Sequence, residues 1–258
     1  ALDGVPAMFM VTTQHIEQHG DDTLRAFVEA GHILGNHSHS HQHPERMGVE
    51  AYLADIKYAH NQLTHWKQYY PYYRFPFLNE GRTESVRDAI RVALAELSLK
   101  HAYVTVDNYD WYMDHLLQEA WQSGQTIALQ ELGQWYAEEM VRSVEFYDDI
   151  ARQQLARSPA HVLLLHENDM AALFLDRVII ALKQRGWRFI SPLEAYQDTI
   201  AQALPDTLFN GQGRVAALAE IEGMQRRDLV PENEDEAYLR AAFQKLIERA
   251  NSEQPPDG

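Results

Sequence analysis

The sequence predicts an α/β fold built around a parallel sheet, either open or closed into a barrel. Short apolar runs alternate along the chain with longer segments whose apolar residues recur every three to four positions. This alternation is typical of strands joined by crossover helices. The length of 258 residues also suits a single barrel with a large core. Right-handed crossovers would bring the carboxyl ends of the strands to one rim, where such folds hold their chemistry.

In the first half of the chain, each predicted strand is followed by a helix. Strands are expected at residues 4–11, 30–35, 72–77 and 101–106, because each is a short apolar run bounded by glycine, proline or polar residues. Helices are expected at residues 21–30, 48–68 and 83–97. The first begins at the capping sequence Gly20-Asp21-Asp22-Thr23, and the other two carry regular apolar faces.

In the second half, helices dominate. Residues 112–155 are expected to be mostly helical, with interruptions near Gly124 and Gly133. Further strands are predicted at 161–165 and 187–190, and further helices at 173–185, 191–196, 213–221 and 235–250. We interpret residues 1–200 as the barrel domain and residues 201–258 as a helical C-terminal extension. The extension would pack on the barrel or on a partner subunit, which leaves a homo-oligomer open, and residues 251–258 are expected to be loose.

Composition excludes several classes of function. The formal net charge of −16, from 38 acidic and 22 basic residues, disfavours nucleic acid as a partner. The chain contains no cysteine, so any metal must be held by histidine and carboxylate. No run is long enough to span a membrane, and residues 1–10 lack the features of a signal peptide. A processed protein would look the same, so these features leave the compartment open.

A histidine-rich tract follows the predicted strand at 30–35. Four of the 13 histidines lie in the seven residues 37–43. Imidazole is a common nitrogen ligand for zinc, and the i, i+4 spacing of His37 and His41 would place both rings on one face if the backbone were helical there. From the tract alone, a specific metal site and a solvated loop that binds metal adventitiously are both consistent.

Other polar clusters lie at or just after predicted strands. They are Arg74-x-Pro76-Phe77, Asp107-x-x-Asp110-Trp111 and Leu163-x-Leu165-His166. With His37-Ser38-x-x-His41, their order along the chain resembles the NodB-like polysaccharide deacetylases of carbohydrate esterase family 4. The resemblance covers residues 4 to about 196, and residues 4–11 are similar to the beginning of that family's second strand. It implies a distorted (β/α)7 barrel that uses one divalent metal, zinc by preference, to remove N- or O-acetyl groups from sugars.

The resemblance also assigns roles to individual residues. His37 and His41 would be metal ligands, Ser38 would shape their loop, and His166 would be the general acid. Asp110, with Asp107 as the alternative, would keep His166 protonated, and Arg74 would orient the catalytic base. Trp111, Leu165 and Pro76 would contact the substrate, the first two around the acetyl methyl. From the residues alone, Ser38 and the aspartates could be turn residues, His166 a helix cap, Arg74 a surface ion pair, and Leu165 and Trp111 plain core.

The chain departs from the family pattern at its start. The family's first motif is an aspartate pair at the end of strand 1, which supplies the base and a third metal ligand. We reject Asp3 for this role, because it directly precedes the 4–11 segment and leaves no room for a helix. Either this sequence is a fragment that lacks strand 1 or the protein is built without that strand, and in this form we expect weaker metal binding and little or no hydrolysis.

Three further functions compete with a sugar deacetylase. One is a noncatalytic glycan-binding or scaffold barrel that has lost the base, and another is an amidase or imidase of the same superfamily. A metal-dependent phosphoesterase would need ligands for a second ion, and His39 and His43 lack a matching carboxylate cluster. The expected ligand is thus a carbohydrate or a small amide, and the resemblance favours the bacterial periplasm or envelope. The central expectation is that His166 and the 37/41 pair share one cavity.

Overall fold

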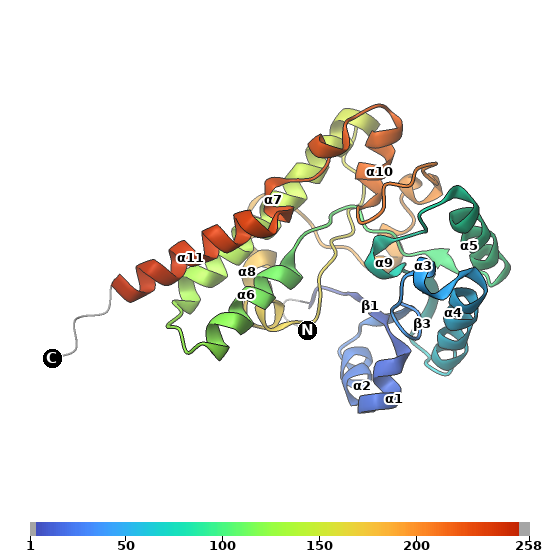
Figure 1. The fold of residues 1–258 in the computed structure, drawn as a ribbon, viewed down its shortest axis with the longest axis horizontal. Helices are drawn as coiled ribbons and strands as arrows, with labels where there is room; N and C mark the ends of the chain where they lie inside the picture. The colour runs from blue at the N-terminus through green and yellow to red at the C-terminus, as the bar shows by residue number, and fades with distance from the viewer. Residues whose placement is uncertain (1–3, 253–258) are drawn as a thin grey trace. The chain divides into compact units, whose positions relative to one another are not determined.

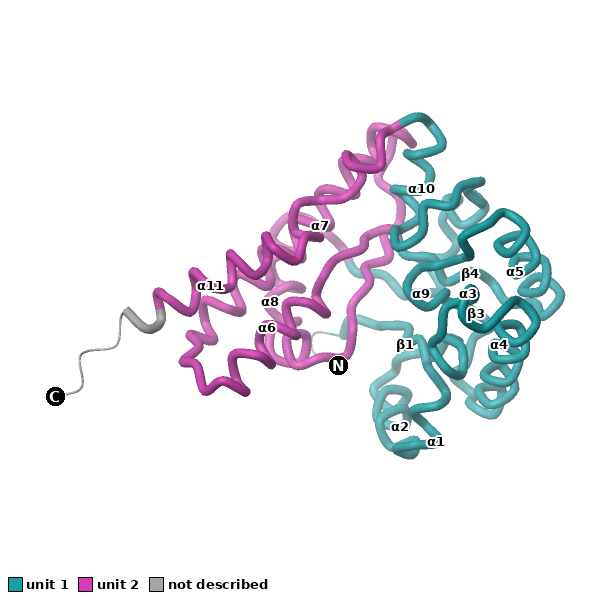
Figure 2. Tube along the Cα trace, in the orientation of Figure 1, with its two compact units in different colours: residues 1–104, 189–223 teal, residues 105–188, 224–258 magenta. Residues whose placement is uncertain are grey.

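The computed structural model describes residues 4–252, which fall into two compact units that are treated separately below (Figure 2). Unit 1 comprises residues 1–104 and 189–223, and unit 2 comprises residues 105–188 and 224–258. The chain therefore leaves unit 1, returns to it and leaves it again. The domain boundary expected near residue 200 stays a prediction, and Asp3 lies outside the described residues.

Unit 1 is organised around a four-stranded parallel sheet in sequential order (Figure 1). The strands are β1 (Met8–Val11), β2 (Ile33–Asn36), β3 (Tyr69–Tyr73) and β4 (Lys100–His101). Val11 pairs with Asn36, and Asn36 pairs with Tyr73, so the carboxyl ends of three strands are level with one another. This register brings the residues that follow each strand, His37 and Arg74 among them, to the same edge. The parallel α/β fold class is confirmed.

Helices connect these strands. They are α1 (Thr13–His19), α2 (Asp22–Glu29), α3 (Pro44–Met47), α4 (Val49–Leu63), α5 (Glu84–Glu96), α9 (Pro192–Ala195) and α10 (Arg214–Ile221). The short helices α1 and α3 were not predicted, whereas α2 and α5 agree closely with the expected ranges. Two 3-10 turns, Pro76–Leu78 and Thr199–Gln202, complete the unit. The helix expected at 48–68 ends early at Leu63, and β3 begins at Tyr69, earlier than predicted.

The core of unit 1 consists of two apolar clusters around the sheet. One joins α4, β3 and α5 through Tyr52, Ile56, Tyr73, Phe75, Ile90, Leu94 and Leu99, all buried. The other joins β1, α2, β2 and the end of α4 through Val11, Leu24, Leu34 and Leu63. Burial of such side chains is the main favourable term in folding. Because α4 contributes to both clusters, it fixes β2 and the loop after it from behind.

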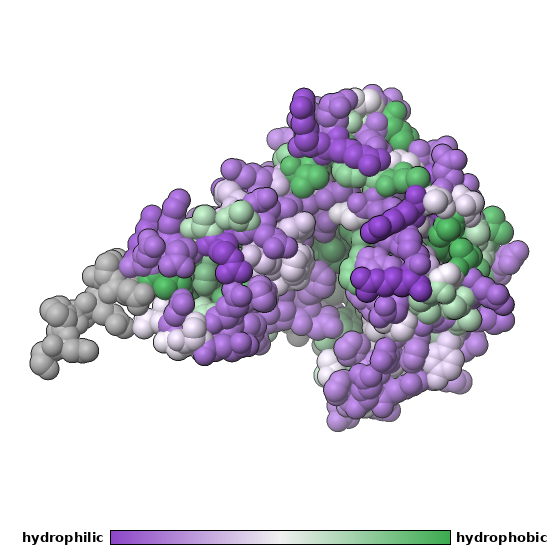
Figure 3. Space-filling view, viewed as in Figure 1, coloured by the Kyte–Doolittle hydropathy of each residue, from purple (hydrophilic) through white to green (hydrophobic). Residues whose placement is uncertain are grey.

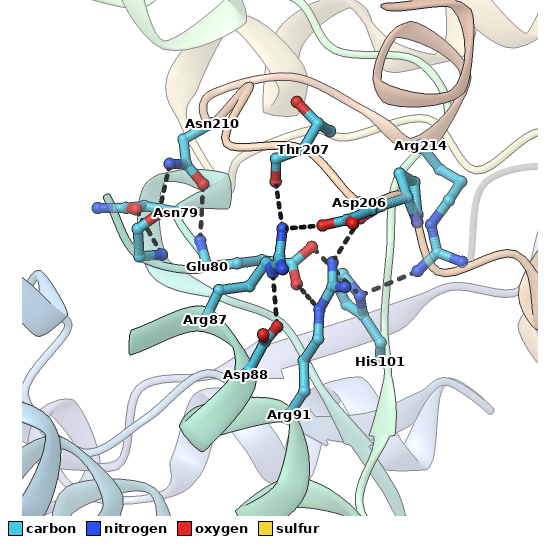
Figure 4. Close-up of polar contacts among 12 residues, drawn as sticks. Asn79, Glu80, Arg87, Asp88, Arg91, His101, Asp206, Thr207, Asn210 and Arg214 are labelled. Atoms are coloured by element: carbon cyan, nitrogen blue, oxygen red, sulfur yellow. Dashed lines mark hydrogen bonds and ion pairs between the residues drawn. The ribbon is translucent and has the colours of Figure 1, made fainter. Parts of the chain in front are cut away.

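Residues 205–214 pack across α5 and β4 through a polar network (Figure 4). Arg87 forms an ion pair with Asp206 at 2.7 Å, and Arg91 donates to the carbonyl of Pro205 and to Glu80. Further inside, Arg214 donates to Nδ1 of His101 at 2.9 Å. Arg214 carries a positive charge, so this nitrogen of His101 accepts the hydrogen bond and the imidazole is neutral.

Unit 2 is helical. Its helices are α6 (Asp110–Gln122), α7 (Leu129–Leu155), α8 (Asp169–Gln184) and α11 (Glu236–Ser252), with 3-10 turns at Arg226–Asp228 and Glu232–Glu234. The turn before α11 is fastened to α7, because Tyr147 donates to Glu234 at 2.6 Å and Asn233 donates to the carbonyl of Glu139 at 2.9 Å. The expected helices at 213–221 and 235–250 are confirmed as α10 and α11.

Strand predictions in the later part of the chain were largely wrong. The strand expected at 101–106 is reduced to β4, and that at 161–165 to an isolated parallel bridge between Val106 and Leu163. Residues 187–190 form no strand. The hydrogen-bond partner of Thr105 Oγ1 explains part of this result, since this side chain accepts the backbone N–H of Val162 at 2.7 Å and replaces a ladder bond.

Gly133 lies inside α7, so the predicted interruption there was wrong, whereas the one near Gly124 separates α6 from α7. A Cβ atom at Gly133 would lie 2.5 Å from Cδ1 of Phe174 on α8. Glycine is thus needed at this position for the close approach of two helices, and it does not end the helix.

The surface visible in Figure 3 is mostly hydrophilic, in keeping with the charge of the chain. Among residues 4–252, no helix combines the length and apolarity needed to cross a bilayer.

Replacing Gly133 by Ala should destabilise the protein, although alanine is the better helix former. The added methyl would overlap the Phe174 ring, and overpacking costs about 1–3 kcal/mol. Chemical denaturation measures the change, with the exposed neighbour Gln134→Ala as the control, expected to change stability by less than about 0.5 kcal/mol. Equal or greater stability of Gly133→Ala would contradict the packing assignment.

Acid should destabilise unit 1 through His101. Burial, with the nearby Arg214, lowers the pKa of His101 to about 3 from 6.5. Between these values the unfolded chain binds a proton that the folded chain does not, so stability falls as pH drops from 6.5 towards 3. At pH 5 the loss attributable to His101 is on the order of 2 kcal/mol. His101→Gln should flatten the stability profile between pH 7 and 5 relative to wild type, whereas the exposed His65→Gln should leave it unchanged.

Candidate functional site

Two histidines converge at the carboxyl end of β2. The Nε2 atoms of His37 and His41 lie 3.1 Å apart. Nδ1 of His37 lies 2.9 Å from the carbonyl oxygen of Arg74, which can only accept, so this nitrogen carries the proton. In its neutral form the ring therefore presents an unprotonated Nε2, the form that binds a metal.

The loop that carries His41 is not helical. The i, i+4 spacing of His37 and His41 therefore does not bring their rings together in the way that it would on a helix. Ser38 and His41 both adopt left-handed conformations, with φ of 71° and 53°. Two side chains hold this shape: Asn36 Oδ1 accepts the N–H of Ser38 at 2.8 Å, and Ser38 Oγ accepts the N–H of His41 at 2.9 Å. These local bonds fold the chain back, so that the two rings meet without a helical turn.

A second anchor for this loop comes from α4. Oδ2 of Asp55 accepts the backbone N–H groups of His39 and Ser40 at 2.8 and 3.2 Å. Asn36, which is fully buried, also donates to the carbonyl of Ile56 at 3.0 Å. The histidine loop is therefore fixed to a rigid helix at several points, as a preorganised site requires.

The spacing of the two imidazoles fits a single cation. Two nitrogen ligands at about 2.0–2.1 Å from a tetrahedral ion lie roughly 3.3 Å from each other, close to the observed 3.1 Å. Among the residues that the structure describes, no group of three or more histidine or carboxylate side chains is placed to hold a metal. His37 and His41 thus fit a divalent metal as a pair of ligands.

Arg74 is buried at the end of β3. Its Nε donates to the carbonyl of Ala102 at 2.9 Å, and its Nη2 donates to the hydroxyl of Tyr196 at 3.2 Å. No ion pair joins Arg74 to a carboxylate within residues 4–252. The guanidinium thus connects the end of β3 to the residue that follows β4 and to the end of α9. The role of Arg74 in orienting a catalytic base stays a prediction.

An aromatic ring closes one side of the histidine pair. Phe77, about half exposed, lies edge-on to His41 with 4.6 Å between ring centroids, and it stacks on His43 at 3.9 Å. Phe77 and the next residue, Leu78, have left-handed φ values of 57° and 48°. Such conformations cost roughly 1–2 kcal/mol per residue. Pro76, which the resemblance placed at the substrate, is buried at the start of this turn.

In unit 2, Asp110 and His166 form a tightly bonded pair. Oδ1 of Asp110 lies 2.7 Å from Nδ1 of His166, and Oδ2 accepts the backbone N–H of His166 at 2.8 Å. The bridge between Val106 and Leu163 brings the two segments together. Asp110 is completely buried, whereas the side chain of His166 is 47% exposed. Asp110 therefore fixes the orientation of an accessible imidazole, in the position expected for it in preference to Asp107.

The remaining predicted residues lie close to this pair in sequence. Trp111 follows Asp110 at the start of α6 and is 42% exposed, with its ring 5.2 Å from that of Tyr109. Leu165, which precedes His166, is half-buried. Both are thus surface-accessible apolar residues and not core residues, Trp111 adjacent in sequence to Asp110 and Leu165 to His166. The prediction that His166 shares a cavity with His37 and His41 stays a prediction.

The polar side chains that build these loops were missed in the sequence. Asn36 and Asp55 are single polar residues in an apolar strand and an amphipathic helix, and neither belongs to a recognisable motif. Asn168 supports the second pair, because its side chain donates to Oδ2 of Asp110 at 3.3 Å and caps α8. Only this one had a sequence signal, since asparagine is a preferred N-cap residue.

Together these observations define a parallel α/β protein with a candidate metal centre at the end of a strand. Residues 2–98 match the family model for polysaccharide deacetylase. This match covers the first part of the chain and agrees with the resemblance seen in the motifs. A search of curated proteins finds no match.

The chain is also similar to solved structures. A polysaccharide deacetylase from Bacillus cereus is 16% identical, with a TM-score of 0.51, over 72% of this chain and 79% of the other. A family 4 carbohydrate esterase from Streptomyces lividans is 21% identical, with a TM-score of 0.45, over 74% and 82%. A family 4 acetyl xylan esterase from Clostridium thermocellum, in complex with a cobalt ion, is 18% identical, with a TM-score of 0.47, over 75% and 78%.

Replacing Asp110 by Asn should disturb both hydrogen bonds to His166. The amide offers one acceptor where the carboxylate offers two, so either the backbone N–H of His166 loses its partner or its Nδ1 must become an acceptor. We expect a change of imidazole tautomer, measured by 15N NMR of His166, and a loss of about 1–3 kcal/mol in stability. The exposed neighbour Glu167→Gln is the control, and an unchanged His166 spectrum in Asp110→Asn would contradict the assignment.

Proposed function

We propose that this protein is a metal-dependent deacetylase of N- or O-acetylated sugars in a glycan or oligosaccharide. The convergence of the two Nε2 atoms of His37 and His41, with the proton of His37 held at Nδ1, carries the proposal. The fold and the family match support the reaction class. Zinc is the metal proposed, because the ligands in this chain are imidazoles and the spacing suits a tetrahedral ion.

The proposed mechanism divides the work between the two residue pairs. A divalent cation held by His37 and His41 would supply an activated water and polarise the acetyl carbonyl. His37 and His41 hold that cation, and their loop bonds keep the two nitrogens at a fixed separation. His166 transfers a proton from Nε2 to the leaving amine or alcohol, while Asp110 holds Nδ1 and sets the ring orientation.

Substrate contacts are proposed for three apolar residues. Trp111 and Leu165, which flank the Asp110–His166 pair, would contact the acetyl methyl, and Pro76, at the start of the turn beside the histidine pair, would contact the substrate elsewhere. Small apolar surfaces beside a proton donor favour a short acyl group over a longer one. Arg74 is proposed to orient a carboxylate base, since a guanidinium fork suits carboxylate geometry.

A noncatalytic glycan-binding protein of the same fold is the second candidate. Two observations on residues 4–252 favour it: Arg74 pairs with a carbonyl and a hydroxyl and forms no carboxylate ion pair, and no group of three metal-ligating side chains is formed. This candidate predicts glycan binding without release of acetate. A panel containing acetylated oligosaccharides and simple or cyclic amides would separate it from the deacetylase and from an amidase or imidase.

Metal binding tests the proposed centre. Calorimetric titration of the metal-free chain with zinc should show one site, and His37→Ala or His41→Ala should weaken zinc binding more than the 10- to 100-fold typical of outer-shell changes, because each removes a ligand directly. His65→Ala, an exposed histidine outside the site, should bind zinc as wild type does. Zinc affinity unaffected by both substitutions would eliminate the proposed centre.

Acetate release tests the reaction. Where the chain hydrolyses N-acetylated oligosaccharides, His166→Gln should lower the rate by about 10²–10⁴-fold, the usual contribution of general acid catalysis. Zinc affinity should change little. Comparing this chain with one extended by its upstream encoded sequence would test the expected need for an aspartate pair, since full activity of the shorter form would show that other carboxylates serve.

A further inference from the structure

The side chain of Asn79 joins the 77–81 loop to the segment after the histidine pair. Its Nδ2 donates to Nδ1 of His43 at 3.1 Å and to Oε2 of Glu45 at 3.0 Å, while its Oδ1 accepts the N–H of Gly81 at 2.9 Å. The Gly81 bond fixes which atom of the amide is the oxygen. Asn79 is 5% exposed, so its own amide group has little contact with water.

Through His43, Asn79 holds the Phe77 ring, which borders the candidate metal centre. The imidazole of His43, held at Nδ1, lies almost parallel to Phe77, with 9° between the planes, and Phe77 contacts His41 with its edge. Phe77 and Leu78 are both in left-handed conformations, which neighbouring contacts must maintain. A line of direct contacts thus runs from Asn79 through His43 and Phe77 to His41.

The same loop is held from the other side by residues 205–214. Asn210 Oδ1 accepts the N–H of Glu80 at 2.9 Å, and Asn210 Nδ2 donates to the carbonyl of Gly81 at 2.8 Å (Figure 4). The N–H of Gly211 donates to the carbonyl of Leu78 at 3.2 Å. Two backbone groups of the loop are therefore paired by one asparagine side chain, which imitates a neighbouring strand.

The segment that carries Asn210 is itself bonded to α5. The ion pair between Arg87 and Asp206 and the bond from Arg91 to the carbonyl of Pro205 fasten the segment to α5. The short side chain of Asn210 could not hold the loop if the backbone that carries it were free to move. Residues more than 160 positions after His41 thus contribute to the shape of the loop beside it.

We propose that Asn79 and Asn210 are positioning residues for the imidazole pair: residues 205–214 fix the 77–81 loop, and the loop holds Phe77 and His43 against His41. The inference rests on the proposed function in one respect, namely that the pair binds a metal. According to this inference, residues 205–214, which lie outside the motifs named above, contribute to metal affinity. Neither asparagine would contact the metal or the substrate.

Histidine 15N NMR of the metal-free chain tests the positioning directly. In wild type, His43 should carry its proton at Nε2, because Nδ1 accepts from Asn79, and His37 should carry its proton at Nδ1. Asn79→Ala should abolish the tautomer preference of His43 and shift the resonances of His41. Asn210→Ala should shift the same His41 and His43 resonances. Gln202→Ala, an exposed position just before the segment, is the matched control and should change neither.

Zinc titration gives the second readout. We expect Asn79→Ala to weaken zinc binding about 10- to 100-fold, the range for residues that orient a ligand, and Asn210→Ala to weaken it several-fold. Thermal unfolding of each variant measures its stability, so that a loss of stability can be told apart from a loss of positioning. Should Asn79→Ala fail to fold, Asn210→Ala carries the test.

The outcomes separate this inference from the proposed function. Wild-type imidazole resonances and zinc affinity in both variants would overturn the positioning role, as would a lowered melting temperature with unchanged resonances. Zinc binding that survives loss of His37 and His41 would overturn the proposed metal centre instead, and the NMR experiment on metal-free protein would still decide the role of the two asparagines.

Discussion

The hydrogen bond from His37 Nδ1 to the carbonyl of Arg74 is the interaction on which the candidate metal centre depends. It joins the residue after β2 to the residue after β3, and it can form because the register between these strands places their ends level. Since a carbonyl only accepts, the bond selects one tautomer and leaves Nε2 to face His41. Backbone geometry thus sets the chemistry of a side chain through one contact.

The surrounding loops hold conformations that their sequences do not favour. Ser38, His41, Phe77 and Leu78 are non-glycine residues with positive φ, and each needs outside support. That support comes from a few short polar side chains with low exposure: Asn36, Ser38 and Asn79 each accept a backbone N–H two or three residues away in their own loop. These local hydrogen bonds hold the loops in their left-handed conformations. Helix α4 and residues 205–214 then fix the loops to the core.

The second pair, Asp110 and His166, uses the same principle in unit 2. A buried carboxylate accepts from both the backbone and the ring of one residue, so position and orientation are fixed together. The motif order along the chain pointed to this pair and to the aspartate that forms it. Strand prediction failed around it, where the N–H of Val162 is accepted by the Thr105 side chain and not by a backbone carbonyl, although the N–H of Thr105 still donates to the carbonyl of Val162.

The sequence by itself determined the parallel α/β class and the helices α2, α5, α10 and α11, because these depend on local periodicity, and its motifs carried the resemblance to a family. Only the tertiary structure decided how His37 meets His41. The i, i+4 spacing would bring the two rings together on a helical turn, whereas the chain folds back through two left-handed residues, Ser38 and His41. It also decided that Gly133 serves helix packing and that Asn79 and Asn210 support the histidine loop. Contacts between residues far apart in sequence leave no periodic signal, so their partners become visible only when the chain is folded.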